Sequence, residues 1–149
     1  MEQTNFIESL REDSIIKRLL ADPQQFPFKE YQEIFQEEYD NRYKWRNINV
    51  GKYHFQNGQV SITKSASALF RSPELIISLI TKDNIFYQKS FESFGKQVNF
   101  VALPANEDGS VEIRGIVGKF FMFDKELDIK ISVYDEKICH ISILVFKIQ

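Results

Sequence analysis

The stretch from Leu127 to Ile148 constrains the fold more than any other part of the chain. Apolar residues recur at every second position on both sides of the polar segment Asp135-Glu136-Lys137. A period of two is typical of a strand with one buried face, so the stretch predicts two antiparallel strands joined by a tight connection. The buried face selects the register, because a slip of one residue would turn every apolar side chain to the other face.

A three-residue loop over Asp135-Glu136-Lys137 produces one wholly apolar face. The facing pairs are then Val133 with Cys139, Ile131 with Ile141, Ile129 with Ile143, and Leu127 with Val145. A two-residue loop would instead set Ile131 against His140. We prefer three residues because the matched apolar pairs outweigh one strained turn residue, which costs about 1 kcal/mol. Cys139 is then buried and His140 lies beside Ser132 on the other face, which argues against a nucleophile–base dyad.

The chain as a whole predicts a single α+β domain spanning residues 1–149. Residues 1–46 are expected to be helical and residues 47–149 mainly β, so that N-terminal helices pack on a curved antiparallel sheet, with a cone-like or half-barrel form as one option. A chain of 149 residues buries enough surface to fold without a disulfide or a structural metal.

Helix signals mark the N-terminal part. Asn5 is the expected cap of a first helix, Asp13 or Ser14 restarts the helix, and Asp22-Pro23 ends it. Aromatic residues at spacings of three and four then predict a further helical run from Phe28 to Tyr39. The glutamates of that run form its opposite face, which is either a solvated surface or a dock for a basic partner.

Turn signals divide the second part of the chain. Asn57-Gly58 predicts a hairpin with Phe55 opposite Val60. Ser72-Pro73-Glu74 combines a cap, a proline and an acid in the order of a helix start, so we predict a short helix near residues 73–81. The competing interpretation is a strand, because the segment LIISLIT is also rich in β-branched residues.

Two strand regions are expected before the terminal hairpin. Residues 85–91 predict one strand, and residues 98–103 are expected to pair antiparallel with residues 110–123 across a turn-rich loop. The apolar phase changes near Gly115, which predicts a β-bulge that bends the strand.

The segment SVEIRGIVGKFF followed by ISVYDEKICHISIL resembles the last strands of the nuclear-transport-factor-like and polyketide-cyclase-like proteins. The resemblance covers the last third of the chain. It implies a cone-shaped fold with a pocket between the sheet and the helices. Because that group includes enzymes, ligand binders and dimerisation modules, the fold alone would not settle the function.

Composition limits the chemistry of the chain. One cysteine and two histidines cannot complete a structural zinc site unless two chains share it, and no glycine-rich phosphate loop is present, so neither a metal nor a cofactor is predicted. The lone cysteine rules out an internal disulfide and favours the cytoplasm. The N-terminus lacks the features of a signal peptide, and no apolar run approaches the roughly 18 residues of a membrane span. A net charge of −2 disfavours nucleic acid as the partner, although residues 42–96 hold nine basic side chains against three acidic ones.

The candidate binding site is the densest basic and aromatic cluster in the chain. It consists of Arg42, Tyr43, Lys44, Trp45 and Arg46. Trp, Tyr and Arg are enriched at the hot spots of protein interfaces, and three positive charges in five residues are costly to bury unpaired. The alternative is structural: basic residues favour a helix C-terminus, and Trp45 could belong to the core.

We therefore expect a non-catalytic, cytoplasmic protein-binding module of the immunity, adaptor or escort kind, whose partner is another protein; a homodimer also fits. The alternative is a small-molecule binder or a pocket enzyme whose cavity is lined by some of the fourteen phenylalanines. A closed interior would favour the first, and an apolar cavity of roughly several hundred Å³ the second. Acid–base chemistry at a buried carboxylate stays open, because a sequence does not show a shifted pKa.

Overall fold

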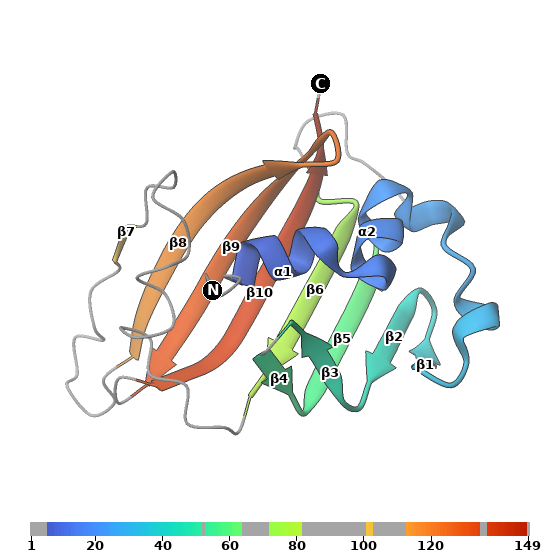
Figure 1. Cartoon of the computed structure of the whole chain (residues 1–149), viewed down its shortest axis with the longest axis horizontal. Coiled ribbons are helices and arrows are strands. Elements are labelled where there is room, and N and C mark those ends of the chain that lie inside the picture. The colour runs from blue at the N-terminus through green and yellow to red at the C-terminus, as the bar shows by residue number, and fades with distance from the viewer. Residues whose placement is uncertain are drawn as a thin grey trace.

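The computed structural model describes residues 6–51, 53–63, 72–81, 101–102, 113–134 and 137–148. Two α-helices of the described residues lie across one face of an antiparallel β-sheet (Figure 1). The predicted α+β class with an antiparallel sheet is therefore confirmed.

The first two predicted helices are present, as α1 (Phe6–Glu12) and α2 (Ser14–Ala21). Asp13 is the N-cap of α2, and its carboxylate accepts hydrogen bonds from the backbone N–H groups of Ile15 and Ile16, both at 3.0 Å. These bonds satisfy donors that have no partner inside the helix, which explains why α2 begins there. Asp22 ends α2, as its position before a proline predicts.

The predicted helix over residues 28–39 is wrong, and with it the expectation that residues 1–46 are helical. The chain instead forms the short 3-10 helices η1 (Pro23–Gln25) and η2 (Phe28–Tyr31), then strands β1 (Phe35–Tyr39) and β2 (Arg42–Trp45). Strands β1 and β2 pair antiparallel, and the chain reverses between them at Asn41, which has a φ of 59°. Asn tolerates this left-handed conformation, so Asp40-Asn41 marks a hairpin rather than a helix end.

Eight strands form the large sheet, in the order β1-β2-β5-β6-β10-β9-β8-β7, with every neighbouring pair antiparallel. Its other members are β5 (Asn57–Ile62), β6 (Leu75–Ile80), β7 (Val101–Ala102), β8 (Ile113–Met122), β9 (Lys125–Tyr134) and β10 (Lys137–Lys147). A separate pair, β3 (Ile48–Val50) and β4 (Tyr53–Phe55), packs against α1. The ring of Phe6 meets those of Tyr53 and Phe55 at centroid distances of 5.6 and 6.0 Å.

The predicted Asn57-Gly58 hairpin is wrong, because Gly58 lies inside β5. It pairs with Trp45 on β2 and with Leu79 on β6. A Cβ atom on Gly58 would lie 2.0 Å from Cδ1 of Ile48 and 3.3 Å from Cε3 of Trp45. A glycine is therefore needed at this position because the side chains of Ile48 and Trp45 approach the strand closely.

The predicted short helix near residues 73–81 is also wrong, and the strand interpretation of this segment holds. Strand β6 runs between β5 and β10, and Leu75, Ile77 and Leu79 are buried on one face of it. The local start signal is overridden by pairing on both sides of the strand. The carboxylate of Glu74 forms an ion pair with Lys125 instead of supporting the first turn of a helix.

The register predicted for the terminal hairpin is confirmed over most of its length. The observed pairs include Ile131 with Ile141, Ile129 with Ile143, and Leu127 with Val145. The connection itself differs, because Tyr134 pairs with Lys137, and a register shift follows at Cys139. This register shift restores the predicted apolar pairing from Ile141 onward.

The predicted burial of Cys139 is wrong. Ile138 faces Val133 in its place and is buried, while the cysteine is exposed at the irregularity, with its Sγ 3.3 Å from the carbonyl oxygen of Ser132. His140 pairs with Ser132 as expected.

The expected antiparallel pairing before that hairpin is confirmed where the structure describes it, between β7 and β8. The bulge predicted near Gly115 is wrong, because β8 and β9 pair without a register shift from Ile113 to Met122. The strand predicted over residues 85–91 lies outside the described residues.

The core lies between the helices and the sheet face that they cover. From the helices Phe6, Leu10, Leu19 and Leu20 are at most 1% exposed, and from the sheet so are Ile129, Ile131, Ile141 and Ile143. These side chains lie between the helices and the sheet, the region in which the resemblance to the cone-shaped proteins implies a pocket.

Candidate functional site

Strand β2 divides the predicted binding cluster between two faces of the sheet. Side chains alternate along a strand, so Tyr43 and Trp45 point to the helix-covered face while Arg42 and Lys44 point to the other. Arg46 is exposed just after the strand ends. The five residues therefore do not form one surface, and each face has to be considered separately.

Trp45 belongs to the core. It is 3% exposed, and its ring stacks on that of Phe35 with a centroid distance of 4.5 Å. Its indole Nε1 is buried and finds no hydrogen-bond acceptor among the described residues. A buried donor without a partner costs about 1–3 kcal/mol, so the apolar contacts of the ring have to outweigh that cost.

Two of the three cationic members of the cluster, Arg42 and Lys44, contact side chains of β1. The guanidinium of Arg42 lies over the ring of Tyr39, 4.7 Å from its centroid. Lys44 lies 3.7 Å from Glu38, which also accepts a 2.7 Å hydrogen bond from Gln59. Exposed pairs of this kind contribute little to stability, about 0–1 kcal/mol, so they leave the two strands' charges available to a partner.

Tyr43 is the member of the cluster that lines a surface depression. Its ring stacks face to face on Phe28, with a centroid distance of 3.7 Å and an interplanar angle of 3°. Partial burial, together with the negative charges of Glu37 and Asp40, raises the pKa of the Tyr43 hydroxyl above its usual value. The hydroxyl therefore stays protonated, and it can donate a hydrogen bond well into the alkaline range.

A groove of about 310 Å³ opens beside these two rings. Its lining residues are Phe28, Lys29, Gln32, Phe35, Gln36, Glu37 and Tyr43. Three of them, Phe35 to Glu37, are consecutive residues of β1, whose side chains point to alternate faces of the sheet. A depression that touches all three has to reach the edge of the strand itself, so the groove lies between η2 and the edge of β1.

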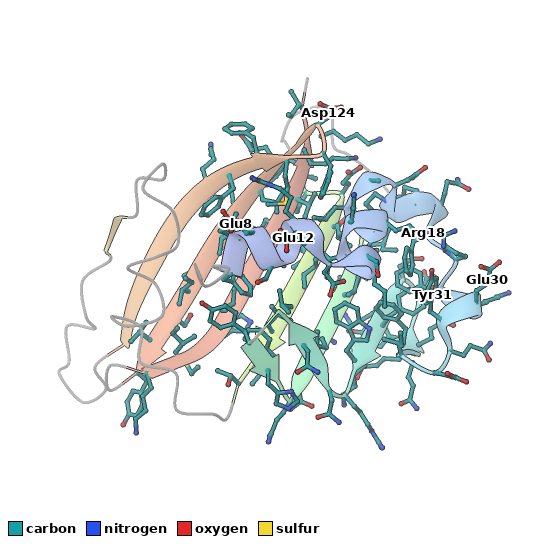
Figure 2. The ribbon with its side chains drawn as sticks, viewed as in Figure 1. Glu8, Glu12, Arg18, Glu30, Tyr31 and Asp124 are labelled. Atoms are coloured by element: carbon teal, nitrogen blue, oxygen red, sulfur yellow. The ribbon has the colours of Figure 1, made fainter. Side chains whose placement is uncertain are left out.

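The wall of the groove opposite β1 is held in place from α2. Figure 2 shows Arg18 of α2 beside Tyr31 of η2, and Nη1 of Arg18 donates a 2.8 Å hydrogen bond to the Tyr31 hydroxyl. Tyr31 in turn stacks on Phe26, and Phe26 packs edge-on against Phe28 at 4.8 Å. This chain of contacts fixes the ring of Phe28 over Tyr43.

Strand β1 is an edge strand, because it pairs with β2 alone among the described residues. Alternate residues of an edge strand direct their N–H and C=O groups away from the sheet, where another strand can pair with them. A register shift between Glu37 and Tyr39 ends the regular part of this edge. Ile34 before the strand and Tyr39 at its end are 38% and 56% exposed.

Negative charge gathers along the same edge. Residues 29–40 contain five acidic side chains and one basic one, Lys29. The acidic members are Glu30, Glu33, Glu37, Glu38 and Asp40, all exposed. We call residues 29–40, which run from η2 through β1, the acidic edge. Figure 2 shows Glu30 at its outer limit.

A second group of charges lies at the ends of three interior strands of the large sheet and has a structural role. Lys125 pairs with Glu74, and these side chains are 11% and 9% exposed. Lys147 lies 3.8 Å from the second oxygen of Glu74. The group closes the end of the core where β6, β9 and β10 meet. The described part of the chain holds no cluster of three or more His, Cys, Asp or Glu side chains arranged to bind a metal.

The chain matches no protein-family model, and no curated protein or solved structure is detectably similar to it. None of the helices in the described segments has the length and apolar character needed to cross a membrane.

Sequence reasoning found Tyr43 but missed the rest of the groove. The spacing of Phe28, Phe35 and Glu37 predicts one amphipathic helix, so the sequence alone does not bring them together with Tyr43. The available signal was Asp40-Asn41, a dipeptide typical of a turn, between two short segments rich in aromatic residues.

Proposed function

We propose that this chain is a non-catalytic protein-binding module and that its partner surface is the acidic edge with the adjoining groove. The observation that carries the proposal is the coincidence of an open strand edge, an aromatic groove and a cluster of acids in one short segment. Strand edges and aromatic pockets are the features that recur in peptide recognition. Immunity, adaptor and escort proteins are the kinds of module that this description suits.

The proposal keeps Tyr43 from the sequence-derived cluster and removes Trp45 from the contact surface. Arg42, Lys44 and Arg46 would lie at the rim, where charges steer association more than they hold the complex together. We also propose a cytoplasmic location, on the grounds of the single cysteine, and a half-barrel curvature of the sheet around α1.

Affinity purification from the native host followed by mass spectrometry tests this function. The parent is compared with Glu37→Lys in the acidic edge and with Glu12→Lys on α1, an exposed glutamate away from that edge (Figure 2). A partner that is lost from the first variant and kept by the second supports the proposal. A partner that is kept by both variants would place the surface elsewhere.

A small-molecule binder is the second candidate, because the groove has about 310 Å³ and is lined by three aromatic residues together with the amides of Gln32 and Gln36. That volume lies at the lower limit of ligand pockets, which hold roughly 300–1,000 Å³. A metabolite extract that raises the melting temperature of the parent, but not that of Gln36→Trp, would favour this candidate.

A further inference from the structure

The outer edge of β1 is the place where a further strand could pair with the large sheet. Within the described residues its outer side has no backbone partner, whereas each interior strand of the large sheet has two neighbouring strands. Unpaired N–H and C=O groups at a sheet edge are templates for strand addition. The register shift after Glu37 limits the regular edge to Phe35–Glu37, which are also the β1 residues that line the groove.

The groove supplies a place for a side chain of such an added strand. Alternate side chains of a strand paired with β1 would point to the face that η2 covers. There they would meet the stacked rings of Phe28 and Tyr43, and the amide of Gln32. The edge would therefore provide the backbone pairing and the groove would select one or two side chains.

Charge decides which segment can occupy this edge. The acidic edge carries five carboxylates against one lysine, and Glu37 has no ion pair among the described residues. A second copy of β1 would bring like charges together across the new strand pair, which is destabilising. A segment rich in Lys and Arg would instead place cations beside Glu33 and Glu37.

From these observations we infer that β1 receives an extended, basic segment of a partner protein as an additional strand, with one of its side chains held in the groove against Phe28 and Tyr43. This inference rests on the proposed protein-binding function, for which it names the mode of recognition and the chemistry of the partner.

The first test uses a phage-displayed library of random linear dodecapeptides selected against the full-length protein. We expect enriched peptides to carry Lys or Arg in a two-residue alternation with aromatic or β-branched residues. Enrichment of acidic peptides, of peptides with helical spacing, or of none would overturn the inference.

The second test uses the best enriched peptide with a fluorescent label. N-methylation of alternate residues removes N–H donors without removing side-chain charge. One of the two alternation phases is expected to weaken binding at least about tenfold, because only one phase faces β1. Equal affinity of both N-methylated peptides and the parent peptide would show that no strand pairing occurs.

Protein variants test the charge argument with the same peptide. We expect Glu37→Lys to raise Kd at least about tenfold and Glu37→Gln to have an intermediate effect, while Glu12→Lys leaves Kd within about twofold. Equal effects of the two reversals would mean that net charge alone attracts the peptide, and would overturn the inference.

The experiments distinguish a failure of strand addition from a failure of the proposed protein-binding function. If a native partner is captured and lost on Glu37→Lys, but the peptide experiments fail, the protein-binding function stands and strand addition is wrong. If affinity purification yields no partner sensitive to that variant, the proposed function itself fails at this surface.

Discussion

Replacing Trp45 tests whether this residue belongs to the core or to an interface, since the sequence is compatible with both roles. A buried tryptophan removes about 200 Å² of mostly apolar surface from water, which at about 25 cal/mol per Å² stabilises the fold by up to about 5 kcal/mol. The buried indole N–H without an acceptor offsets about 1–3 kcal/mol of this. A truncation also leaves a cavity beneath Phe35 and Gly58. We therefore expect Trp45→Ala to lower the free energy of unfolding by about 3–5 kcal/mol.

Trp45→Phe provides the matched comparison. Phenylalanine keeps a ring against Phe35 and removes the unpaired donor, so we expect a loss of only about 1 kcal/mol. Arg46→Ala, at the exposed neighbouring position, should stay within about 0.5 kcal/mol of the parent.

Urea unfolding followed by far-UV circular dichroism measures all three variants, with the free energy of unfolding extrapolated to water. The reasoning fails if Trp45→Ala unfolds within about 1 kcal/mol of the parent, because the side chain would then not be part of the core. If Trp45→Phe lowers the free energy of unfolding as much as Trp45→Ala does, the expected benefit of keeping a ring against Phe35 is wrong. Affinity for the partner should be unchanged in Trp45→Phe, because this side chain lies beneath the surface.

Three further outcomes follow from the geometry. Cys139 is exposed, so a thiol reagent should label the native protein at a rate close to that of the urea-unfolded chain, and Cys139→Ser should cost less than about 0.5 kcal/mol. Burial and the nearby Lys130 lower the pKa of His140, so the unfolded chain binds a proton at this residue more readily than the folded one. The free energy of unfolding should therefore fall as the pH drops below about 6.5. Urea titrations between pH 7.5 and 5.5 should show a smaller fall for His140→Asn. Asp124 has a φ of 57° in the exposed turn between β8 and β9, so Asp124→Gly should raise the free energy of unfolding by about 0.5–1 kcal/mol; a lower value than that of the parent would show that the aspartate makes a compensating contact.

The parts of the fold that the sequence predicted well are those in which pattern and environment agree. Buried and more exposed residues alternate over residues 127–134 of β9 and again over residues 140–146 of β10, so a single buried face determined the register. Asp13 before α2 combines a cap with the start of an apolar stripe. In both regions several local signals favour the same structure.

The incorrect predictions share a different cause, which is tertiary pairing that overrides a local signal. Ser72-Pro73-Glu74 starts helices in isolation, yet β6 is paired on both sides and its apolar residues complete the core. Gly58 follows an asparagine, as in a tight turn, but its missing side chain makes room for Ile48 and Trp45. The pairing of β6 and the packing around Gly58 both involve residues distant in sequence, so a short segment of the sequence does not predict them.

The sequence does not predict the candidate site for a related reason, and the same reason decides which variants can test its function. The sequence predicts Phe28 and Phe35 on one helix and Tyr43 beyond its end, but the hairpin at Asn41 brings the ring of Tyr43 back against that of Phe28, which also packs on Phe35. The same reversal makes β1 an edge strand and sets its acids along that edge. Groove, open edge and charge therefore depend on one turn. A variant that keeps the turn and changes a single exposed side chain, such as Glu37→Lys, reverses one charge and leaves the strand edge and the stacked rings of Phe28 and Tyr43 in place, whereas a deletion across residues 35–45 would remove edge, rings and charge together.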